Sequence, residues 1–309
     1  MRIVITGVAG LIGSNLSRLL LEEGHDVVGI DDLSGGLLSR VDSRVRFKQL
    51  DIAQDDLDDA LAGAEAVFHL AAYSAVPDCQ ENPARAISTN ALGTFRVFDA
   101  MRRTGVHRLI QAETSAVYEG TSLRPTPESE NAPQTVYAFT KQCGASVVQS
   151  LAPAAGIAVT TLRYFNVYGA GHDYRRVRGP VIASFIGAIL REETPVIYGD
   201  GSVARDFIHV DDVNSFHLLC LEDNRTSGQT FNLGTGKAVS VDEILNLVRD
   251  EMSSDARPQY VPTTIPEAPL TIADIERAKA LGWHPTIDLA LGVRKCIAEA
   301  RDQLAPLEA

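Results

Sequence analysis

A tyrosine and a lysine four residues apart could carry acid–base chemistry in this chain. Tyr137 and Lys141 stand in the segment YAFTK, and this spacing puts both side chains on one face of a helix. A phenol with a pKa of about 10 is a poor base at neutral pH, but a nearby ammonium favours its ionised form and so makes proton transfer possible. The same spacing is common on solvated helix faces, so the pair gains weight from the hydroxyl of Thr114, which follows an apolar run upstream.

A glycine-rich turn near the start of the chain could hold a dinucleotide. Gly7, Gly10 and Gly13 follow the strand-like segment RIVITG and open a helical pattern from about Leu11 to Glu23. Residues without a Cβ allow a tight turn and a close approach of pyrophosphate, and the helix N-terminus offers N–H groups and a positive dipole end. Glycines also serve ordinary turns, but this strand–turn–helix setting favours dinucleotide binding.

Three aspartates that follow the next strands could complete that site. Asp31 ends the second strand, 18 residues after Gly13, where a carboxylate can accept hydrogen bonds from ribose hydroxyls and repel a 2′-phosphate. Asp32 could share this role, and no arginine follows directly in DDLSGG, so we expect NAD rather than NADP. Asp51 could meet the adenine or cap the following turn.

Strand-like and helical segments alternate through the first half of the chain. The apolar strands are expected in RIVITG, HDVVGIDD, VRFKQLD, AVFHLA, HRLIQAE and AVTTLRYFNV, separated by helices. Continuous apolar strands between helices indicate a parallel sheet covered on both faces. We therefore predict a Rossmann-type, doubly wound α/β fold over residues 1–168, with a return segment at about 206–235, and a smaller, mixed substrate-binding domain over 169–205 and 236–309.

Composition excludes several classes of function. A net charge of −12 argues against a general nucleic-acid binder. The four cysteines are far apart, with no CxxC and no Cys/His cluster at metal-ligand spacing, so we expect reduced thiols and no metal. No apolar run approaches the roughly 18 residues of a membrane span, and the chain begins without a signal-peptide pattern. We expect a cytoplasmic protein without membrane or nucleic-acid partners.

Several segments together resemble the extended short-chain dehydrogenase/reductase family, in particular its nucleotide-sugar epimerases and dehydratases. The resemblance covers nearly the whole chain and rests on TGVAGLIG, DDLSGG, VFHLAAYSAV, STNALGT, TSAVY, YAFTK, LRYFNVYG, IYGDGSVARDFIHVDDV, FNLGTG and ADIERAKALGWHP. It implies that Thr114 bonds the sugar 4-hydroxyl and that Tyr137 takes its proton as hydride passes from C4 to NAD. Lys141 would bind the nicotinamide ribose and lower the Tyr137 pKa.

The resemblance also implies two sets of binding residues. The cofactor set is Gly7, Gly10, Leu11, Ile12, Gly13, Asp31, Asp32, Asp51, Ile52, Leu70, Ala71, Ala72, Asn90, Tyr137, Lys141 and Tyr164. The substrate set is Tyr73, Thr114, Ser115, Asn166, Val181, Arg205 and Thr271. Two of these have a structural alternative: Asn90 could tie its helix to a strand, and Arg205 could pair with Asp206 or Asp211.

The residues after Thr114 bear on which reaction follows oxidation at C4. Related 4,6-dehydratases commonly have an Asp–Glu pair where this chain has Ser115 and Ala116, and related decarboxylases commonly have Glu at Ala116. Glucuronate 4-epimerases often have Thr where Asn166 stands. The resemblance thus implies a 4-epimerase of a UDP-hexose with tightly held NAD. The alternatives are a dehydratase or decarboxylase that uses Glu113 or Glu119 in place of the missing carboxylates, a glucuronate epimerase, and a non-catalytic NAD-binding regulator.

Departures from the family pattern bear on the substrate. The stretch 261–274 has no arginine, whereas many relatives have one there on the nucleotide, so CDP- and dTDP-sugars stay open. Arg175, Arg176 and Arg178 could replace it or form a solvated loop. The resemblance places Thr271 near a position where side-chain bulk limits acceptance of N-acetyl sugars, so this small residue would leave room for them. Cys79 stands where relatives usually have Ser near the diphosphate. By resemblance we expect a homodimer through helices around 86–104 and 137–152.

Overall fold

The large sheet of this computed structural model confirms the predicted fold class. The structure describes residues 1–172, 174, 179–263 and 268–304. Among them, seven strands form a sheet in the order β10-β6-β5-β4-β1-β2-β3, and every neighbouring pair is parallel. The strands are β1 (Arg2–Thr6), β2 (Asp26–Asp31), β3 (Arg46–Gln49), β4 (Ala66–His69), β5 (Arg108–Thr114), β6 (Ala158–Tyr164) and β10 (Thr230–Leu233).

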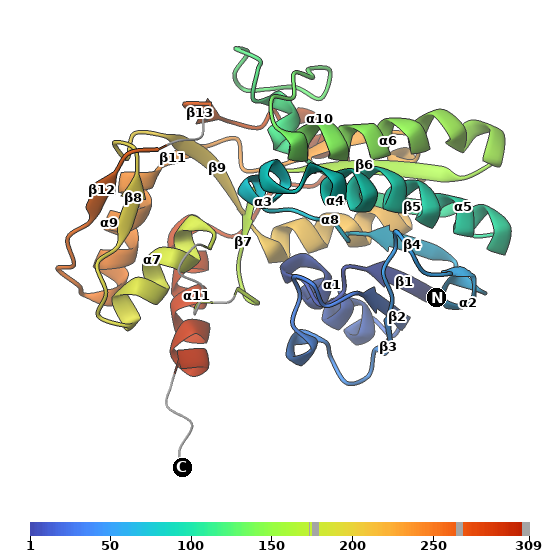
Figure 1. The fold of residues 1–309 in the computed structure, drawn as a ribbon, viewed down its shortest axis with the longest axis horizontal. Helices are drawn as coiled ribbons and strands as arrows, with labels where there is room; N and C mark the ends of the chain where they lie inside the picture. The colour runs from blue at the N-terminus through green and yellow to red at the C-terminus, as the bar shows by residue number, and fades with distance from the viewer. Residues whose placement is uncertain (173, 175–178, 264–267, 305–309) are drawn as a thin grey trace.

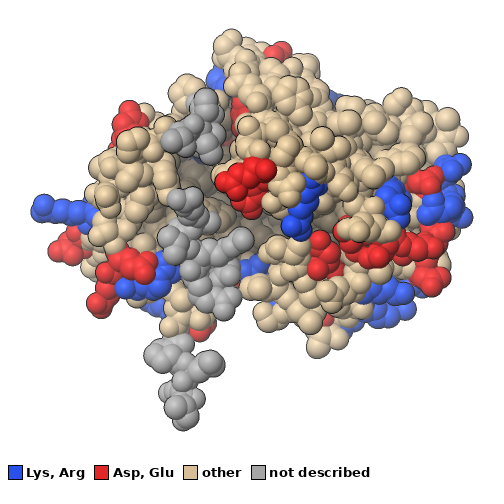
Figure 2. Space-filling model, in the orientation of Figure 1, with Lys and Arg blue, Asp and Glu red and all other residues tan. Residues whose placement is uncertain are grey.

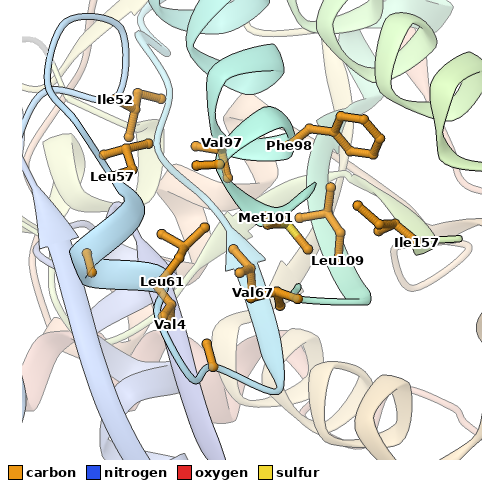
Figure 3. Close-up of a cluster of buried hydrophobic side chains, with 14 of the residues drawn as sticks. Val4, Ile52, Leu57, Leu61, Val67, Val97, Phe98, Met101, Leu109 and Ile157 are labelled. Carbon is orange, nitrogen blue, oxygen red and sulfur yellow. The ribbon is translucent and has the colours of Figure 1, made fainter. Parts of the chain in front are cut away.

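Helices cover both faces of this sheet (Figure 1). On one face α1 (Leu11–Glu22) packs against α8 (Val210–Glu222). On the other face lie α2 (Asp58–Leu61), α5 (Thr94–Thr104) and α6 (Val136–Ala155). Strand residues alternate between the two cores, so Ile3 joins the α1 side while Val4 joins the α5 side. Figure 3 shows Val4, Val67 and Leu109 from the strands packed against Val97 and Met101 of α5.

A smaller part of the molecule is built from short strands and three longer helices. Its central strand β9 (Ala204–His209) pairs with β11 (Ala238–Ser240), β13 (Leu270–Thr271) and β7 (Asn166–Tyr168), and β8 (Val196–Tyr198) pairs with β12 (Gln259–Val261). The helices α7 (Val181–Leu190), α9 (Val241–Met252) and α11 (Leu289–Leu304) share one core. Figure 1 shows these elements gathered beside the large sheet.

The expected return segment divides between the two parts. Residues 206–209 lie in β9 of the small sheet, whereas α8 and β10 join the large one. The short helix α10 (Glu276–Lys279) packs against β10, so the chain returns to the large sheet a second time. The domain boundaries themselves stay a prediction.

The expected long helix after β4 is interrupted. Two short helices, α3 (Val76–Glu81) and α4 (Pro83–Ala86), lead into a π-helical segment, η2 (Ile87–Gly93), before α5 begins. Such segments break the regular ladder and often occur at functional sites. Here α6 passes very close to η2, because a Cβ on Gly144 would lie 2.4 Å from the carbonyl oxygen of Asn90.

Three single 3₁₀ turns complete the elements. They are η1 (Leu38–Arg40), η3 (Ser115–Tyr118) and η4 (Asn224–Thr226). Of the helices in the described residues, none has both the length and the apolar content needed to cross a membrane.

Candidate active site

Most of the predicted cofactor residues and Thr114 lie at or just after the carboxyl ends of the large sheet's strands. Parallel strands end at the same edge, so the segments that follow β1, β2, β4, β5 and β6 meet there. Thr114 ends β5 and Tyr164 ends β6, in register with each other, and the glycine turn follows β1. Figure 2 shows a hollow in the middle of one face of the molecule, between its two parts.

The three expected catalytic residues come from β5 and from the first turns of α6. Thr114 is buried at the end of β5, and its Oγ1 accepts a hydrogen bond from the Ala116 N–H at 3.1 Å. Helix α6 begins one residue before Tyr137, capped by Thr135, and Lys141 lies buried one turn further on. A side-chain hydrogen bond joins Tyr137 to Thr114.

Burial sets the protonation of this group. It raises the pKa of Tyr137 to about 12, partly offset by the hydrogen bond with Thr114. Burial also lowers the pKa of Lys141 to about 8, against the opposing charge of Glu113. Of the groups that act on Tyr137 here, the Thr114 hydroxyl lowers its pKa, and the expected effect of Lys141 on that pKa stays a prediction. At pH 7 most Lys141 side chains are charged and Tyr137 is neutral.

The glycine turn packs tightly against the loop after β4 and leaves the N-terminus of α1 open. Gly7 has φ +75°, and a Cβ there would lie 2.7 Å from the Ala71 nitrogen; a Cβ on Gly13 would lie 2.3 Å from the Gly7 oxygen. Helix α1 starts after Gly10 with no capping side chain and no acidic residue in its first turn. Its first N–H groups, at Leu11, Ile12 and Gly13, can therefore receive an anion.

The aspartates around this turn also shape it. The Asp31 carboxylate accepts hydrogen bonds from the N–H groups of Ala9 at 3.0 Å and Leu33 at 2.8 Å. These bonds oppose burial, which raises the Asp31 pKa. Asp32 is exposed and lies 4.0 Å from Arg85. Asp51 accepts from the N–H of Ala53 at 2.8 Å, which is the turn-capping alternative, so its role towards adenine stays a prediction.

Asn90 ties η2 to the loop after β4 and to α6, as its structural alternative proposed, and its contact with the cofactor stays a prediction. Its side-chain oxygen accepts from the Tyr73 N–H at 2.8 Å, and its amide donates to the Tyr73 oxygen at 2.9 Å and to Thr140 Oγ1 at 3.1 Å. Asn90 thus fixes the loop Leu70, Ala71, Ala72 and Tyr73 against α6, at the wall where the cofactor is expected. Ile52 is buried beneath η2, against Gly93, so only its backbone remains for the cofactor.

His69, at the end of β4, is a site residue that sequence reasoning missed. Its Nδ1 lies 2.8 Å from Thr6 Oγ1 and its Nε2 lies 2.9 Å from Thr94 Oγ1. Thr94 donates to the Asn90 carbonyl oxygen, and Thr6 accepts from the Ala71 N–H. The only consistent assignment has Nε2–H donating to Thr94 and Nδ1 accepting from Thr6. Burial lowers the His69 pKa to about 3, so the ring stays neutral and holds both cofactor walls.

Tyr164 is held from the opposite side of the sheet. Its hydroxyl lies 2.7 Å from Nε2 of His217, whose Nδ1 lies 3.0 Å from Asn214 Oδ1. Burial raises the Tyr164 pKa well above its usual value. The phenol therefore ties β6 to α8, and the cofactor contact expected for Tyr164 stays a prediction.

A buried polar cluster lies next to Thr114, and we call Glu113, Tyr118, Glu128, Arg163 and Asn232 the closed cluster. Arg163 donates from Nε to Glu113 at 2.5 Å and from Nη1 to the Tyr118 hydroxyl at 2.8 Å and the Glu128 carbonyl at 2.9 Å. Tyr118 donates to Asn232 at 2.7 Å, and the Asn232 N–H donates to Glu128 at 2.9 Å. Glu113 is therefore committed to an ion pair and is not free to act as a base.

Two arginines lie close together at the small sheet. Arg205 on β9 is paired in register with Thr271 on β13, and its Nη1 donates to the Ala268 oxygen at 2.7 Å. Arg124, from the loop after η3, donates from Nε to the Leu270 oxygen at 2.7 Å. Burial and the charge of Arg205 both lower the Arg124 pKa. The local sequence around Arg124 does not predict that it lies near Arg205, because Leu270 and Arg205 are far from Arg124 along the chain.

The other expected substrate residues lie nearby or outside the description. Asn166 on β7 donates to the Asp206 oxygen at 3.1 Å, and Val181 opens α7. The Asp206 carboxylate accepts a hydrogen bond from the Thr235 N–H, and the Asp211 carboxylate accepts one from Lys295. Both carboxylates expected as partners of Arg205 therefore have other partners. Ser115 opens η3. Arg175, Arg176 and Arg178 lie outside the described residues.

Comparisons with known proteins agree with this geometry. A family model described as the NAD dependent epimerase/dehydratase family matches residues 3–234. UDP-glucose 4-epimerase of Mycolicibacterium smegmatis is 33% identical over 313 residues, covering 98% of this chain and 99% of that protein.

Two solved structures share the whole fold. That of UDP-glucose 4-epimerase from Thermotoga maritima with UDP-glucose has a TM-score of 0.94 at 33% identity, covering 98% of this chain and 100% of that one. That of the Thermus thermophilus UDP-glucose 4-epimerase complex with NAD has a TM-score of 0.91 at 27% identity, covering 97% and 99%. The chain belongs to the NAD-dependent epimerase/dehydratase family, and its cofactor is NAD.

Proposed function

We propose that this protein is an NAD-dependent 4-epimerase that interconverts UDP-glucose and UDP-galactose. The observation that carries the proposal is that Thr114, Tyr137 and Lys141 stand without a carboxylate at the two positions after Thr114, where dehydratases and decarboxylases would have one. Ser115 and Ala116 have none, and Glu113 is paired with Arg163. Epimerisation needs only one proton and one hydride to leave and return, whereas dehydration or decarboxylation calls for further acid or base groups.

Each residue has one task in this scheme. Bound NAD would supply the hydride acceptor and donor for the sugar C4. Thr114 orients the sugar 4-hydroxyl, and Tyr137 takes its proton and later gives it back. The buried ammonium of Lys141 favours the tyrosinate once substrate and cofactor exclude water, because charges interact more strongly at low dielectric.

Product analysis tests this function directly. The protein is incubated with UDP-glucose, and the nucleotide sugars are separated and weighed by mass spectrometry. We expect UDP-galactose of unchanged mass, approaching a fixed equilibrium from either sugar. A keto-sugar lighter by one water would instead indicate a dehydratase, and no change with any nucleotide sugar would indicate a regulator.

The nucleotide diphosphate end is proposed to lie against Arg205 and Arg124. Two guanidinium groups held side by side repel each other, and a diphosphate between them would relieve that repulsion and offer bidentate partners. This pair supplies the cation that the stretch 261–274 lacks. The thermal stabilisation given by UDP-, CDP- and dTDP-glucose shows which base the protein prefers. R124M is expected to reduce the stabilisation by all three nucleotide sugars and to leave the preference among the bases unchanged.

The sugar pocket is proposed to accept N-acetyl sugars as well. Thr271 is small and buried, and its hydroxyl has no partner within the described chain. T271Y should abolish turnover of UDP-N-acetylglucosamine while retaining that of UDP-glucose. No turnover of the N-acetyl substrate by the parent protein would remove this part of the proposal.

A homodimer is the proposed assembly. Phe139, Val147 and Leu151 are 55%, 40% and 41% exposed along one stripe of α6, and Ile87 and Leu92 of the adjoining η2 are 56% and 48% exposed. A twofold interface places the same patch on both copies, and burying the exposed half of these side chains would contribute roughly 1 kcal/mol each. Sedimentation should give a dimer, and F139D should give a monomer of unchanged fold.

A cytoplasmic location belongs to the same proposal. All four cysteines, Cys79, Cys143, Cys220 and Cys296, are free thiols, as in a reducing compartment. Cys143 lies within the α6 stripe, four residues from Phe139 and from Val147, so oxidative cross-linking of Cys143 provides a second probe of the dimer.

A further inference from the structure

An arginine on the short helix α4 lies across the mouth of the dinucleotide site. Arg85 forms an ion pair with Asp32 at 4.0 Å, and its guanidinium carbon lies 4.8 Å from the centre of the Tyr73 ring. Asp32 follows β2, and Tyr73 belongs to the loop after β4. Strand β1 runs between these two strands, so the Arg85 side chain spans the turn from Gly7 to Gly13 that follows β1.

The charges around that turn give this arginine a role. Two carboxylates lie at the end of β2 beside the turn: Asp31, the last residue of the strand, accepts from the Ala9 N–H, and Asp32 accepts from the Ser34 N–H. The residues of the turn itself, TGVAGLIGSNL, include no lysine or arginine. A pyrophosphate carries two negative charges. Backbone N–H groups at the start of α1 provide dipoles on one side, and Arg85 provides a full positive charge on the other.

The contacts of Arg85 are weak enough to be exchanged. Its side chain is 43% exposed and that of Asp32 is 38% exposed, and an ion pair of this kind contributes roughly 0–1 kcal/mol. The Tyr73 ring holds the guanidinium over the site by a cation–π contact, and Asn90 in turn holds the Tyr73 backbone. A phosphate offers Arg85 a stronger, bidentate partner.

We propose that Arg85 closes over the pyrophosphate of bound NAD and sets how slowly the cofactor leaves. The guanidinium leaves its loose pair with Asp32 and binds the phosphate oxygens, so the dinucleotide lies between the α1 N-terminus and Arg85. An epimerase that regenerates its cofactor in every turnover benefits from such retention. This inference depends on NAD binding and not on the identity of the sugar.

The release rate of NAD tests the proposal. The holoenzyme is loaded with labelled NAD, chased with excess unlabelled NAD and sampled by rapid gel filtration. R85A should release NAD roughly 10- to 100-fold faster, the range expected for a lost hydrogen bond to a charged group, and R85K should fall between R85A and the parent. Competition by ADP-ribose, which keeps the pyrophosphate, should weaken by the same factor in R85A.

R102A is the matched control. Arg102 is an exposed arginine that pairs with Asp99 on α5. It lies near the C-terminal end of α5, just before β5 begins, and so at the end of the sheet away from the glycine turn. Its release rate should stay within about twofold of the parent. An unchanged release rate in R85A would overturn the proposal. So would an R85A defect confined to the KM for UDP-glucose at saturating NAD, or a defect confined to NADP, which would place Arg85 on the substrate or on a 2′-phosphate.

Discussion

Two groups of buried polar side chains meet where β5 ends, and they differ in how fully protein partners use them. In the closed cluster, Arg163 bonds Glu113 and Tyr118, and Tyr118 bonds Asn232. In the catalytic group, Tyr137 bonds Thr114, and Lys141 is buried with its pKa lowered to about 8. Glu113 and Thr114 are adjacent in the chain, yet one belongs to each group.

The number of protein partners that a buried polar side chain has therefore distinguishes a structural role from a catalytic one better than its residue type does. Both groups contain a tyrosine and a buried cation, and each includes one of the last two residues of β5. A buried charge with full partners costs much to disturb, because removing one partner leaves the other unpaired. A buried charge with few partners is itself a cost, and it persists where binding or catalysis requires it. The closed cluster should therefore govern stability, and the catalytic group activity.

The largest effect should separate the two tyrosines. Y137F removes the proton carrier, so we expect kcat to fall by about 10²- to 10⁴-fold with little change in unfolding temperature. Y118F removes one buried hydrogen-bond partner from Asn232 and one from Arg163, which should cost about 1–3 kcal/mol of unfolding free energy while kcat stays within a few-fold. Steady-state epimerase assays and urea denaturation measure both. A Y118F enzyme that is stable but inactive would reverse the assignment.

The next effect should appear when the ion pair of the closed cluster is broken. R163M leaves the Glu113 carboxylate, which is 3% exposed, without its cation, and such losses cost about 3–5 kcal/mol. The double variant E113Q/R163M should recover part of this loss. Urea denaturation of both variants measures it, with R44A as control, since Arg44 pairs with Asp42 at the surface. Equal stability of R163M and the parent would contradict a structural role.

The sequence predicted those features that depend on local pattern. Apolar strands separated by helices indicated the parallel sheet, and a shared strand edge then placed the glycine turn, Thr114 and Tyr137 together. It did not predict that Glu113 is paired, because its partner Arg163 lies on the next strand, 50 residues away, and only strand register brings them together.

Long-range contacts also explain the remaining misses. Arg124 reaches the carbonyl of Leu270, 146 residues away, through a loop without periodicity. His69 ends an apolar strand and has no local signal for its two threonine partners. The π-helical segment η2 depends on the close passage of α6 at Gly144, which no helical pattern in residues 87–93 reveals.

A third prediction concerns the cost of the buried lysine. Lys141 has a pKa of about 8 in the folded protein against 10.5 in its ordinary state, so between these values the unfolded chain binds a proton that the folded one does not. Stability therefore rises with pH across that window, and below pH 8 the full cost is present. K141M should raise the unfolding free energy at pH 7 by up to about 3 kcal/mol, with activity lost.

The pH dependence of that gain is the sharper measurement. Thermal melts of NAD-free K141M and parent protein from pH 7 to pH 10.5 should show the advantage shrinking towards zero. K279M is the control, because Lys279 is exposed and pairs with Glu276 on its own helix. A K141M protein that is less stable at pH 7 would mean that Lys141 has partners of the kind found in the closed cluster, and the contrast between the two groups would fail.

The smallest effect should come from Thr114, where the two groups touch. Its hydrogen bond lowers the Tyr137 pKa, and one hydrogen bond of about 1 kcal/mol corresponds to somewhat less than one pKa unit. Since Tyr137 acts as a base, activity rises with pH until the phenol ionises, so T114A should move this limb to higher pH and T114S should restore it. Profiles of kcat/KM against pH measure the shift. Should T114A lower activity equally at every pH, Thr114 would only position the sugar hydroxyl, and the tuning of Tyr137 would have to come from substrate and cofactor alone.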